Sequence, residues 1–433
     1  RNLEKTSTPI DPRSIIVSIN LHQSPPKNLD DFKSNEFIEL VRSSGLKIED
    51  HFFSNQNSIS VSHFLTKGKM EELKTLVTEK NIKLVVLDCE LSPSQERNLE
   101  KSLHARVLDR TGLILDIFAS RAESDIGKLQ VELAQLSFLS TRLVRGWSHL
   151  ERQKGGIGLR GPGETQLETD RRLINDRIKQ LKKRLNKQHN QKNLNRYSRK
   201  KGSNKLVGLV GYTNAGKTSL FNVLTKSSLY VADKLFATLD TTTRKANFKS
   251  KAFNTILFSD TVGFISNLPT NLIESFKATL DDLTSTDLLI HVIDAADLNI
   301  DFKIHQVDSI LDDLGVTEIP QIRALNKIDL TNEPCTQLDN NLYPQLKIST
   351  KSGEGINKLK KEISETLFGE VMAGWVHFLP IHAAIRSKLF DSGCVIEEKI
   401  DENGCYQSFI EISQNMFKQL EDLENFKDLK PVS

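Results

Sequence analysis

Four short, almost uninterrupted apolar runs constrain the fold of this 433-residue chain more than any other feature of its sequence. They cover residues 206–210, 254–258, 288–293 and 322–325. Runs of this kind are typical of parallel strands that are buried on both faces of a sheet. Amphipathic segments separate them, for example at 272–283 and 304–314. The sequence therefore predicts a doubly wound α/β domain over residues 204–368.

A loop with two glycines follows the first apolar run and precedes the amphipathic start of a helix. It fits the pattern G-x-x-x-x-G-K-[ST], whose backbone N–H groups converge on phosphate oxygens at a helix N-terminus. We expect Lys217 to reach the β- and γ-phosphates of a nucleotide and the Thr218 hydroxyl to ligate Mg²⁺. We call this segment the phosphate loop, and we expect all of its residues to contact the nucleotide: Gly211, Tyr212, Thr213, Asn214, Ala215, Gly216, Lys217 and Thr218.

Two motifs at the ends of later apolar runs complete a nucleotide site. The first places a carboxylate beside Mg²⁺ and a glycine N–H near the γ-phosphate, and it consists of Asp260, Thr261, Val262 and Gly263. The second consists of Asn326, Lys327, Ile328 and Asp329. Asp329 can accept both N–H groups of the guanine edge, and adenine lacks one of them, so we expect a preference for GTP. A main-chain N–H from Ser349, Thr350 and Lys351 would support the base.

The segment between the phosphate loop and Asp260 has the composition of a nucleotide-sensing switch. We expect it to contact GTP through Phe236, Ala237, Thr238, Leu239 and Asp240. A threonine hydroxyl that reaches Mg²⁺ only when the γ-phosphate is present is the usual sensor of nucleotide state. We assign this second metal contact to Thr238, with Thr242 as the alternative, and we expect Lys217 and Thr238 to carry catalysis.

Phe264 occupies the position after Gly263, where many small GTPases carry a glutamine that orients the attacking water. A phenylalanine cannot do this. We therefore expect slow GTP hydrolysis by the protein alone and stimulation by a partner.

The rest of the chain divides into three parts. Residues 11–120 alternate short β-branched runs (14–19 and 83–88) with helical patterns (37–42 and 70–77), which predicts a small N-terminal α/β domain. In residues 369–433, a helical pattern at 383–390 precedes two strand-like segments, 394–400 and 405–412. The Asn-Gly pair between these segments indicates a hairpin, so we expect a small α+β domain.

Residues 121–203 carry two long runs of helical periodicity, which predict a helical hairpin. Its tip, residues 155–163, has five glycines in nine residues, so the backbone can approach a partner closely; a merely flexible loop fits this composition equally well. The polar, basic stretch 188–204 lacks an apolar period and reads as a solvated linker.

Charge is unevenly distributed along the chain. The formal net charge is only +3, but residues 171–205 hold fourteen basic side chains against the single acid Asp176, a net of +13 that leaves −10 for everything else. Such a basic stripe suggests a polyanionic partner, although charge runs are often only solvated surface. Tyr197 is the only aromatic residue in the stripe, which favours recognition of the shape and backbone of structured RNA over the reading of single strands.

Several longer segments resemble the HflX family of ribosome-associated GTPases. They are residues 92–99, 109–118, 127–136, 161–172, 236–240 and 260–265, and the likeness runs from about Ser14 to Phe368. Thr241 stands where the family usually has proline, and Thr350 where the last motif usually has alanine. The resemblance implies a P-loop GTPase that binds the large ribosomal subunit in its GTP form and separates stalled or stressed ribosomes. It also implies that the hairpin reaches rRNA, with contacts from Gly155, Gly156, Gly158, Arg160, Gly161, Gly163, Arg171 and Arg172.

Two other functions remain open from the residues alone. One is a regulatory GTPase with a protein effector, and the other is an RNA-modifying or RNA-remodelling factor that uses GTP as a switch. The four cysteines are far apart and form no C-x-x-C pair, which argues against a zinc site or a disulfide scaffold. The sequence has neither an apolar run long enough to span a membrane nor a secretory signal, so we expect a cytoplasmic protein. We also expect it to be monomeric.

Overall fold

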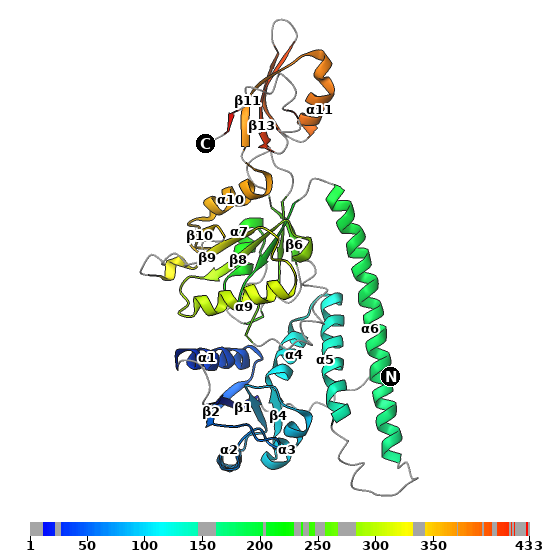
Figure 1. Ribbon diagram of the computed structural model, residues 1–433, viewed down its shortest axis with the longest axis vertical. Coiled ribbons are helices and arrows are strands. Elements are labelled where there is room, and N and C mark those ends of the chain that lie inside the picture. The colour runs from blue at the N-terminus through cyan, green and yellow to red at the C-terminus, as the bar shows by residue number, and fades with distance from the viewer. Residues whose placement is uncertain are drawn as a thin grey trace. The chain divides into compact units, whose positions relative to one another are not determined.

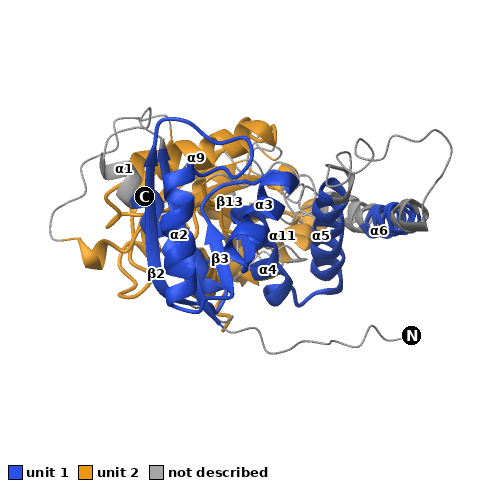
Figure 2. Ribbon diagram, turned by 90° about the horizontal axis from the view of Figure 1, so that it is seen from below, with its two compact units in different colours: residues 1–190, 233–239, 267–277 blue, residues 191–232, 240–266, 278–433 orange. Residues whose placement is uncertain are grey.

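The computed structural model describes most of the chain. The described residues are 12–21, 27–145, 162–201, 205–228, 235–236, 242–246, 256–266, 283–331, 343–369, 371–391, 394–400, 405–414, 417, 420 and 430–431. They fall into two compact units, coloured separately in Figure 2. Unit 1 comprises residues 1–190, 233–239 and 267–277, and unit 2 comprises residues 191–232, 240–266 and 278–433.

The N-terminal part of unit 1 is the predicted α/β domain. Its parallel sheet has the strand order β2-β1-β3-β4. The elements are β1 (Arg13–Leu21), α1 (Lys27–Ser43), β2 (Lys47–Gln56), α2 (Lys67–Glu79), β3 (Leu84–Leu87), α3 (Pro93–Leu103), β4 (Arg106–Asp109) and α4 (Arg110–Arg121). The sequence interpretation missed β2 because this edge strand is polar and only two of its residues are buried.

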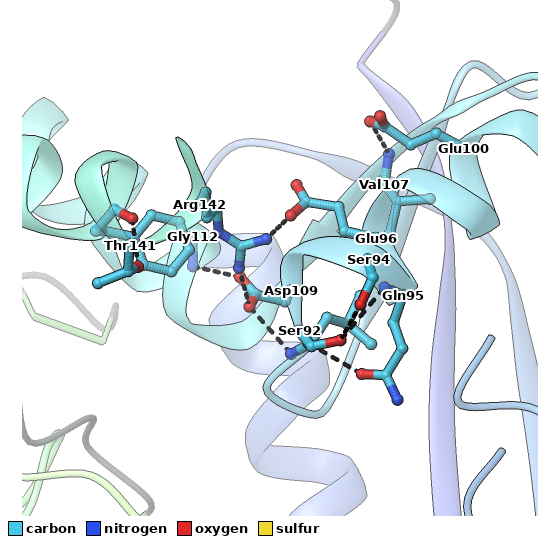
Figure 3. A network of polar contacts seen from close by, with 12 residues as sticks. Ser92, Ser94, Gln95, Glu96, Glu100, Val107, Asp109, Gly112, Thr141 and Arg142 are labelled. Carbon is cyan, nitrogen blue, oxygen red and sulfur yellow. Dashed lines mark hydrogen bonds and ion pairs between the residues drawn. The ribbon is translucent and has the colours of Figure 1, made fainter. Parts of the chain in front are cut away.

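Polar contacts tie this domain to the first hairpin helix, α5 (Asp125–Arg145). Ser92 and Gln95 form a capping box at the start of α3, and Asp109 caps α4 by accepting from the Gly112 N–H at 2.8 Å. The guanidinium of Arg142, on α5, lies between Asp109 (2.6 Å) and Glu96, as Figure 3 shows. Two of the segments that resemble HflX proteins therefore provide helix caps and an anchor for the hairpin.

The predicted hairpin is present as α5 and α6 (Pro162–Lys201), which run side by side (Figure 1). They pack through Leu133, Leu181 and Leu185, which are buried together. The expectation of a linker over 188–204 is wrong, because α6 continues to Lys201. Residues 188–201 contain no Gly or Pro and are rich in Lys, Gln and Arg, which are strong helix formers even without an apolar face.

Unit 2 contains the predicted doubly wound domain, with the strand order β10-β9-β8-β5-β7-β6. All neighbours are parallel except β6, which is antiparallel to β7. The strands are β5 (Lys205–Val210), β6 (Thr242–Ala246), β7 (Ile256–Asp260), β8 (Leu288–Asp294), β9 (Gln321–Asn326) and β10 (Gln345–Lys347), and the helices are α7 (Lys217–Thr225), α9 (Ile300–Asp313) and α10 (Ile356–Phe368). Among the described residues, the carboxyl ends of β5, β7 and β9 carry the sequence motifs.

The C-terminal part of unit 2 is the predicted α+β domain. An antiparallel sheet of order β12-β13-β11-β14 packs against helix α11 (Ala383–Asp391) through a core that includes Val376, Leu389 and the buried side chain of Cys394. Its strands are β11 (Val371–Phe378), β12 (Val395–Ile400), β13 (Tyr406–Ser413) and β14 (Lys430–Pro431). In the described part of the chain, no helix is both long and apolar enough to cross a bilayer.

The hairpin contact gives a first prediction. Leu181 is fully buried against α5, whereas Leu173 on the same helix is 59% exposed. Leu181→Ala should lower the local stability of the hairpin by about 2–4 kcal/mol because it leaves a cavity, and Leu173→Ala should change it by less than about 0.5 kcal/mol. Amide hydrogen exchange in α5 and α6 measures both. Equal protection in the two variants would contradict the packing described here.

Candidate nucleotide-binding site

The phosphate loop can form only with glycine at two positions. Gly211 has φ +148°, and a Cβ on it would lie 2.3 Å from the carbonyl oxygen of Val292 on β8. Gly216, the N-cap of α7, has φ +93°, and a Cβ there would lie 2.3 Å from Nδ2 of Asn326 on β9. The loop is thus held against two neighbouring strands by contacts that no side chain permits.

Lys217 and Thr218 open α7 directly after this loop. The Lys217 ammonium is buried and donates to the carbonyl oxygens of Gly211 (3.0 Å) and Tyr212 (2.7 Å). Burial lowers the pKa of Lys217 from 10.5 to about 8. A phosphate group next to the ammonium would raise this pKa again, because it stabilises the charged form.

The donor set next to Lys217 fits Mg²⁺. The hydroxyl of Thr218 donates to Oδ2 of Asp260 at 2.8 Å, and Asp260 is fully buried at the end of β7. Hydroxyl and carboxylate oxygens are the hard ligands that Mg²⁺ prefers. Gly263 lies close by, since a Cβ on it would lie 2.8 Å from the Thr213 side chain and 3.1 Å from Nζ of Lys217.

The base-recognition side is joined to the phosphate loop by Asn326. Its buried side chain donates to the Ala215 carbonyl oxygen (3.0 Å) and accepts from the Thr350 N–H (3.1 Å). The ammonium of Lys327 is paired with Asp294 at 2.7 Å. The sequence interpretation missed Asp294, although its place as the last residue of an apolar strand could have indicated it.

Asp329 is exposed, so its carboxylate is accessible to a base. The hydroxyl of Ser349 donates to its Oδ1 at 2.6 Å, and this hydrogen bond lowers the pKa of Asp329 below its ordinary value. Asp329 is therefore ionised at neutral pH and acts only as an acceptor, which matches the two donors of the guanine edge.

Phe264 is fixed to the phosphate loop by its main chain. Its N–H donates to the Gly211 carbonyl oxygen at 3.2 Å, and its carbonyl oxygen accepts from the Thr213 N–H at 2.7 Å. The N–H of Ser266 donates to the Tyr212 hydroxyl at 2.7 Å. The Phe264 side chain is 2% exposed and packs as an apolar residue. It therefore offers no polar group at the position where many small GTPases have a glutamine that orients the attacking water.

Some of the remaining predicted site residues lie in other elements, and others lie outside the described part of the chain. Phe236 has its ring against Phe118 of α4, and Thr242 lies on β6 opposite Asp260. Residues 237–241, with Thr238 among them, lie outside the described residues. The glycine-rich segment 155–161 also lies outside them, whereas Gly163, Arg171 and Arg172 belong to α6.

Three family profiles match the chain. They are described as GTP-binding GTPase N-terminal (residues 32–119), GTP-binding GTPase middle region (residues 121–199) and 50S ribosome-binding GTPase (residues 206–327).

Individual proteins are similar over most of the chain. GTPase HflX of Escherichia coli is 44% identical over 391 residues, 90% of this chain and 91% of that protein. GTPase HflX of Caldanaerobacter subterraneus is 43% identical over 394 residues, 90% of this chain and 89% of that protein. Among solved structures, a GTP-binding protein from Sulfolobus solfataricus in complex with GDP is 24% identical, covers 82% of this chain and 98% of that chain, and has a TM-score of 0.43.

The acceptor role of Asp329 gives a second prediction. Asp329→Asn should lower GTP affinity by at least ~100-fold and raise the affinity for XTP, because the amide can donate to the xanthine 2-carbonyl. Competition binding with GTP and XTP measures the shift. Asp313→Asn, the same change at an exposed residue of α9, should leave both affinities unchanged. Retained guanine selectivity in Asp329→Asn would contradict the assignment.

The buried ammonium of Lys217 gives a third prediction. At pH 8.5 most of this group is deprotonated, so GTP binding should take up a proton, and GTP affinity should fall as the pH rises through about 8. The nucleotide phosphates are already ionised at this pH. Titration calorimetry in buffers of different ionisation enthalpy measures the uptake, which should shrink at pH 7.2. A binding heat independent of the buffer at pH 8.5 would refute the prediction.

Proposed function

This chain belongs to the HflX family of GTPases, and we propose that it binds the large ribosomal subunit in its GTP form and separates stalled or stressed ribosomes. The observation that carries the proposal is the exposed basic surface of α6, in the same chain as a guanine-nucleotide site. GTP is hydrolysed to GDP and phosphate. Because the proposed ribosome-bound state requires GTP, hydrolysis at the nucleotide site would end it.

Hydrolysis depends on how the phosphates are held. The phosphate loop and the Lys217 ammonium bind the β- and γ-phosphates, and the Gly263 N–H lies within reach of the same place. We propose that Thr218 and Thr238 hold Mg²⁺, with Asp260 beside them. When bound, Mg²⁺ neutralises charge that develops on the phosphate oxygens. A water then attacks the γ-phosphate, its proton passes to the phosphate product, and GDP leaves.

Phe264 makes this reaction slow in the isolated protein. A buried phenylalanine cannot accept a hydrogen bond from the attacking water, and its main chain is committed to Gly211 and Thr213. The groups that orient the water must come from elsewhere, and we propose that ribosome binding supplies or positions them. In other GTPases, completing the catalytic set raises the rate by about 10³- to 10⁵-fold.

The surface of α6 is suited to an RNA backbone. The helix has 40 residues and is thus about 60 Å long. Arg177 is paired with Glu132 of α5 at 2.7 Å. Among the α6 side chains whose burial the structure describes, seven other basic ones are exposed: Arg171, Arg172, Lys179, Lys182, Lys183, Arg184 and Lys187. Basic side chains spread along one rigid helix fit the regularly spaced phosphates of structured RNA.

The family profile that matches residues 206–327 supports the choice of partner, since its description names the 50S ribosome. We propose that the glycine-rich tip and the start of α6 contact rRNA and that the protein acts as a monomer in the cytoplasm. Arg171 and Arg172 lie near the start of α6 and are exposed.

Cosedimentation with large ribosomal subunits tests the proposal. With a non-hydrolysable GTP analogue the protein should pellet with the subunits, and with GDP it should pellet much less. Lys182→Glu together with Lys183→Glu should weaken binding at least ~10-fold near 0.15 M salt and make its dependence on salt concentration shallower by about two in the log–log slope.

The matched control is Lys358→Glu together with Lys361→Glu, the same charge change on the exposed side of α10. This control should bind subunits as the unchanged protein does. Equal losses in the two double variants would refute a specific role for α6. Failure to cosediment in any nucleotide state would refute the ribosomal partner and leave a protein effector as the alternative.

A further inference from the structure

The side chain of Tyr212, the second residue of the phosphate loop, reaches the segment that follows β7. Its hydroxyl accepts a hydrogen bond from the Ser266 N–H at 2.7 Å. Tyr212 is 5% exposed and Ser266 is 2% exposed, so this hydrogen bond is shielded from water. Both residues belong to unit 2. The phosphate loop thus provides a side-chain contact to the segment that carries Gly263.

The same segment is bonded to the loop through its main chain as well. Phe264 forms a one-residue parallel bridge with Tyr212. Its N–H donates to Gly211 and its carbonyl oxygen accepts from Thr213. Both of these bonds belong to a single residue, so by themselves they would let the chain turn about Phe264. The hydrogen bond at Ser266, two residues further on, removes this freedom.

The ring of Tyr212 is itself held by α9. The ammonium of Lys303 lies 4.8 Å from the centroid of the ring, and it is also paired with Asp297. An ammonium in this position is attracted by the face of the aromatic ring. The main chain of Tyr212 is fixed too, since its carbonyl oxygen accepts from the Lys217 ammonium at 2.7 Å. The place of the hydroxyl is therefore determined from both ends of the residue.

We propose that Tyr212 is a positioning residue for GTP hydrolysis, whose hydroxyl keeps Gly263 beside the Lys217 ammonium. A Cβ on Gly263 would lie 3.1 Å from Nζ of Lys217, so the two residues lie side by side. The inference rests on the proposed mechanism, in which both residues meet the γ-phosphate. Donors that are fixed before the substrate binds need no reorganisation as charge develops. GDP has no γ-phosphate, so the contact with Ser266 should matter for GTP alone.

Tyr212→Phe tests this role in the full-length protein, because it removes the hydroxyl and keeps the ring. The variant takes this acceptor away from a buried N–H, so the segment should leave its position more often and kcat/KM for GTP hydrolysis should fall about 5- to 50-fold. The amide of Ser266 should exchange hydrogen faster. The dissociation constant of GDP should change less than about 2-fold, because GDP does not distinguish the two positions of the segment. Thermal melting establishes that the variant is folded.

Two further variants serve as control and as a check on the role of the ring. Tyr343→Phe, the same change at a ring that lies against Arg323 in unit 2, should leave all three quantities unchanged. Lys303→Met removes the charge over the Tyr212 ring and should lower kcat/KM about 2- to 5-fold. Combined with Tyr212→Phe it should cause no further loss, because the place of the ring no longer matters once the hydroxyl is gone.

Gly263→Ala distinguishes failure of this inference from failure of the proposed mechanism. If Gly263→Ala loses hydrolysis and Tyr212→Phe retains the unchanged kcat/KM, the positioning role is refuted and the mechanism stands. If Gly263→Ala retains full activity, the premise is wrong and the proposal falls with it. Equal losses of affinity for GDP and for a non-hydrolysable GTP analogue in Tyr212→Phe would indicate a distorted phosphate loop and would also overturn the proposal.

Discussion

The buried side chain of Asn326 is the connection on which the nucleotide site depends. It donates to the Ala215 carbonyl oxygen and accepts from the Thr350 N–H, so one amide fixes the phosphate loop relative to the base-binding loop. The contact requires Gly216, because a Cβ there would lie 2.3 Å from the Asn326 amide nitrogen. The phosphates and the base of a guanine nucleotide are joined by a ribose of fixed size. A rigid link between the two loops therefore lets the site bind the phosphates and the base at the same time.

Ionisable groups are used in two contrasting ways within unit 1. In the N-terminal domain they are buried and paired: Arg110 lies 2.6 Å from both Glu36 and Asp88, and Arg142 joins α5 to Asp109. Burial raises the pKa of Asp109 to about 6, which shows the desolvation that such a network must offset. Removing one partner of such a pair would leave an uncompensated buried charge. The pair of Arg142 with Asp109 therefore fixes the position of α5 on the N-terminal domain. The basic side chains of α6 have the opposite character, exposed and suited to a partner.

An element could be predicted from the sequence where its burial requires a recognisable pattern of apolar residues. The strands β5, β7, β8 and β9 are buried on both faces, so their apolar runs were recognisable, and the glycine spacing of the phosphate loop located the site. Edge strands leave no such pattern: β2 is mostly polar, and β6 reads Thr-Thr-Arg-Lys-Ala. The end of α6 was missed because a fully solvated helix has no apolar period. The packing of Phe236 on Phe118 joins residues 118 positions apart, which no local pattern encodes.

That long-range contact makes Phe236 part of the same compact unit as α5. The domain that holds Phe236 also holds α5, through Arg142, and α5 packs against α6. Coupling between two sites is reciprocal, so a ligand on α6 that weakened the hold on Phe236 would itself bind more tightly once Phe236 is released, by the same free energy. A ligand with equal affinity for the held and the released state of Phe236 would transmit nothing.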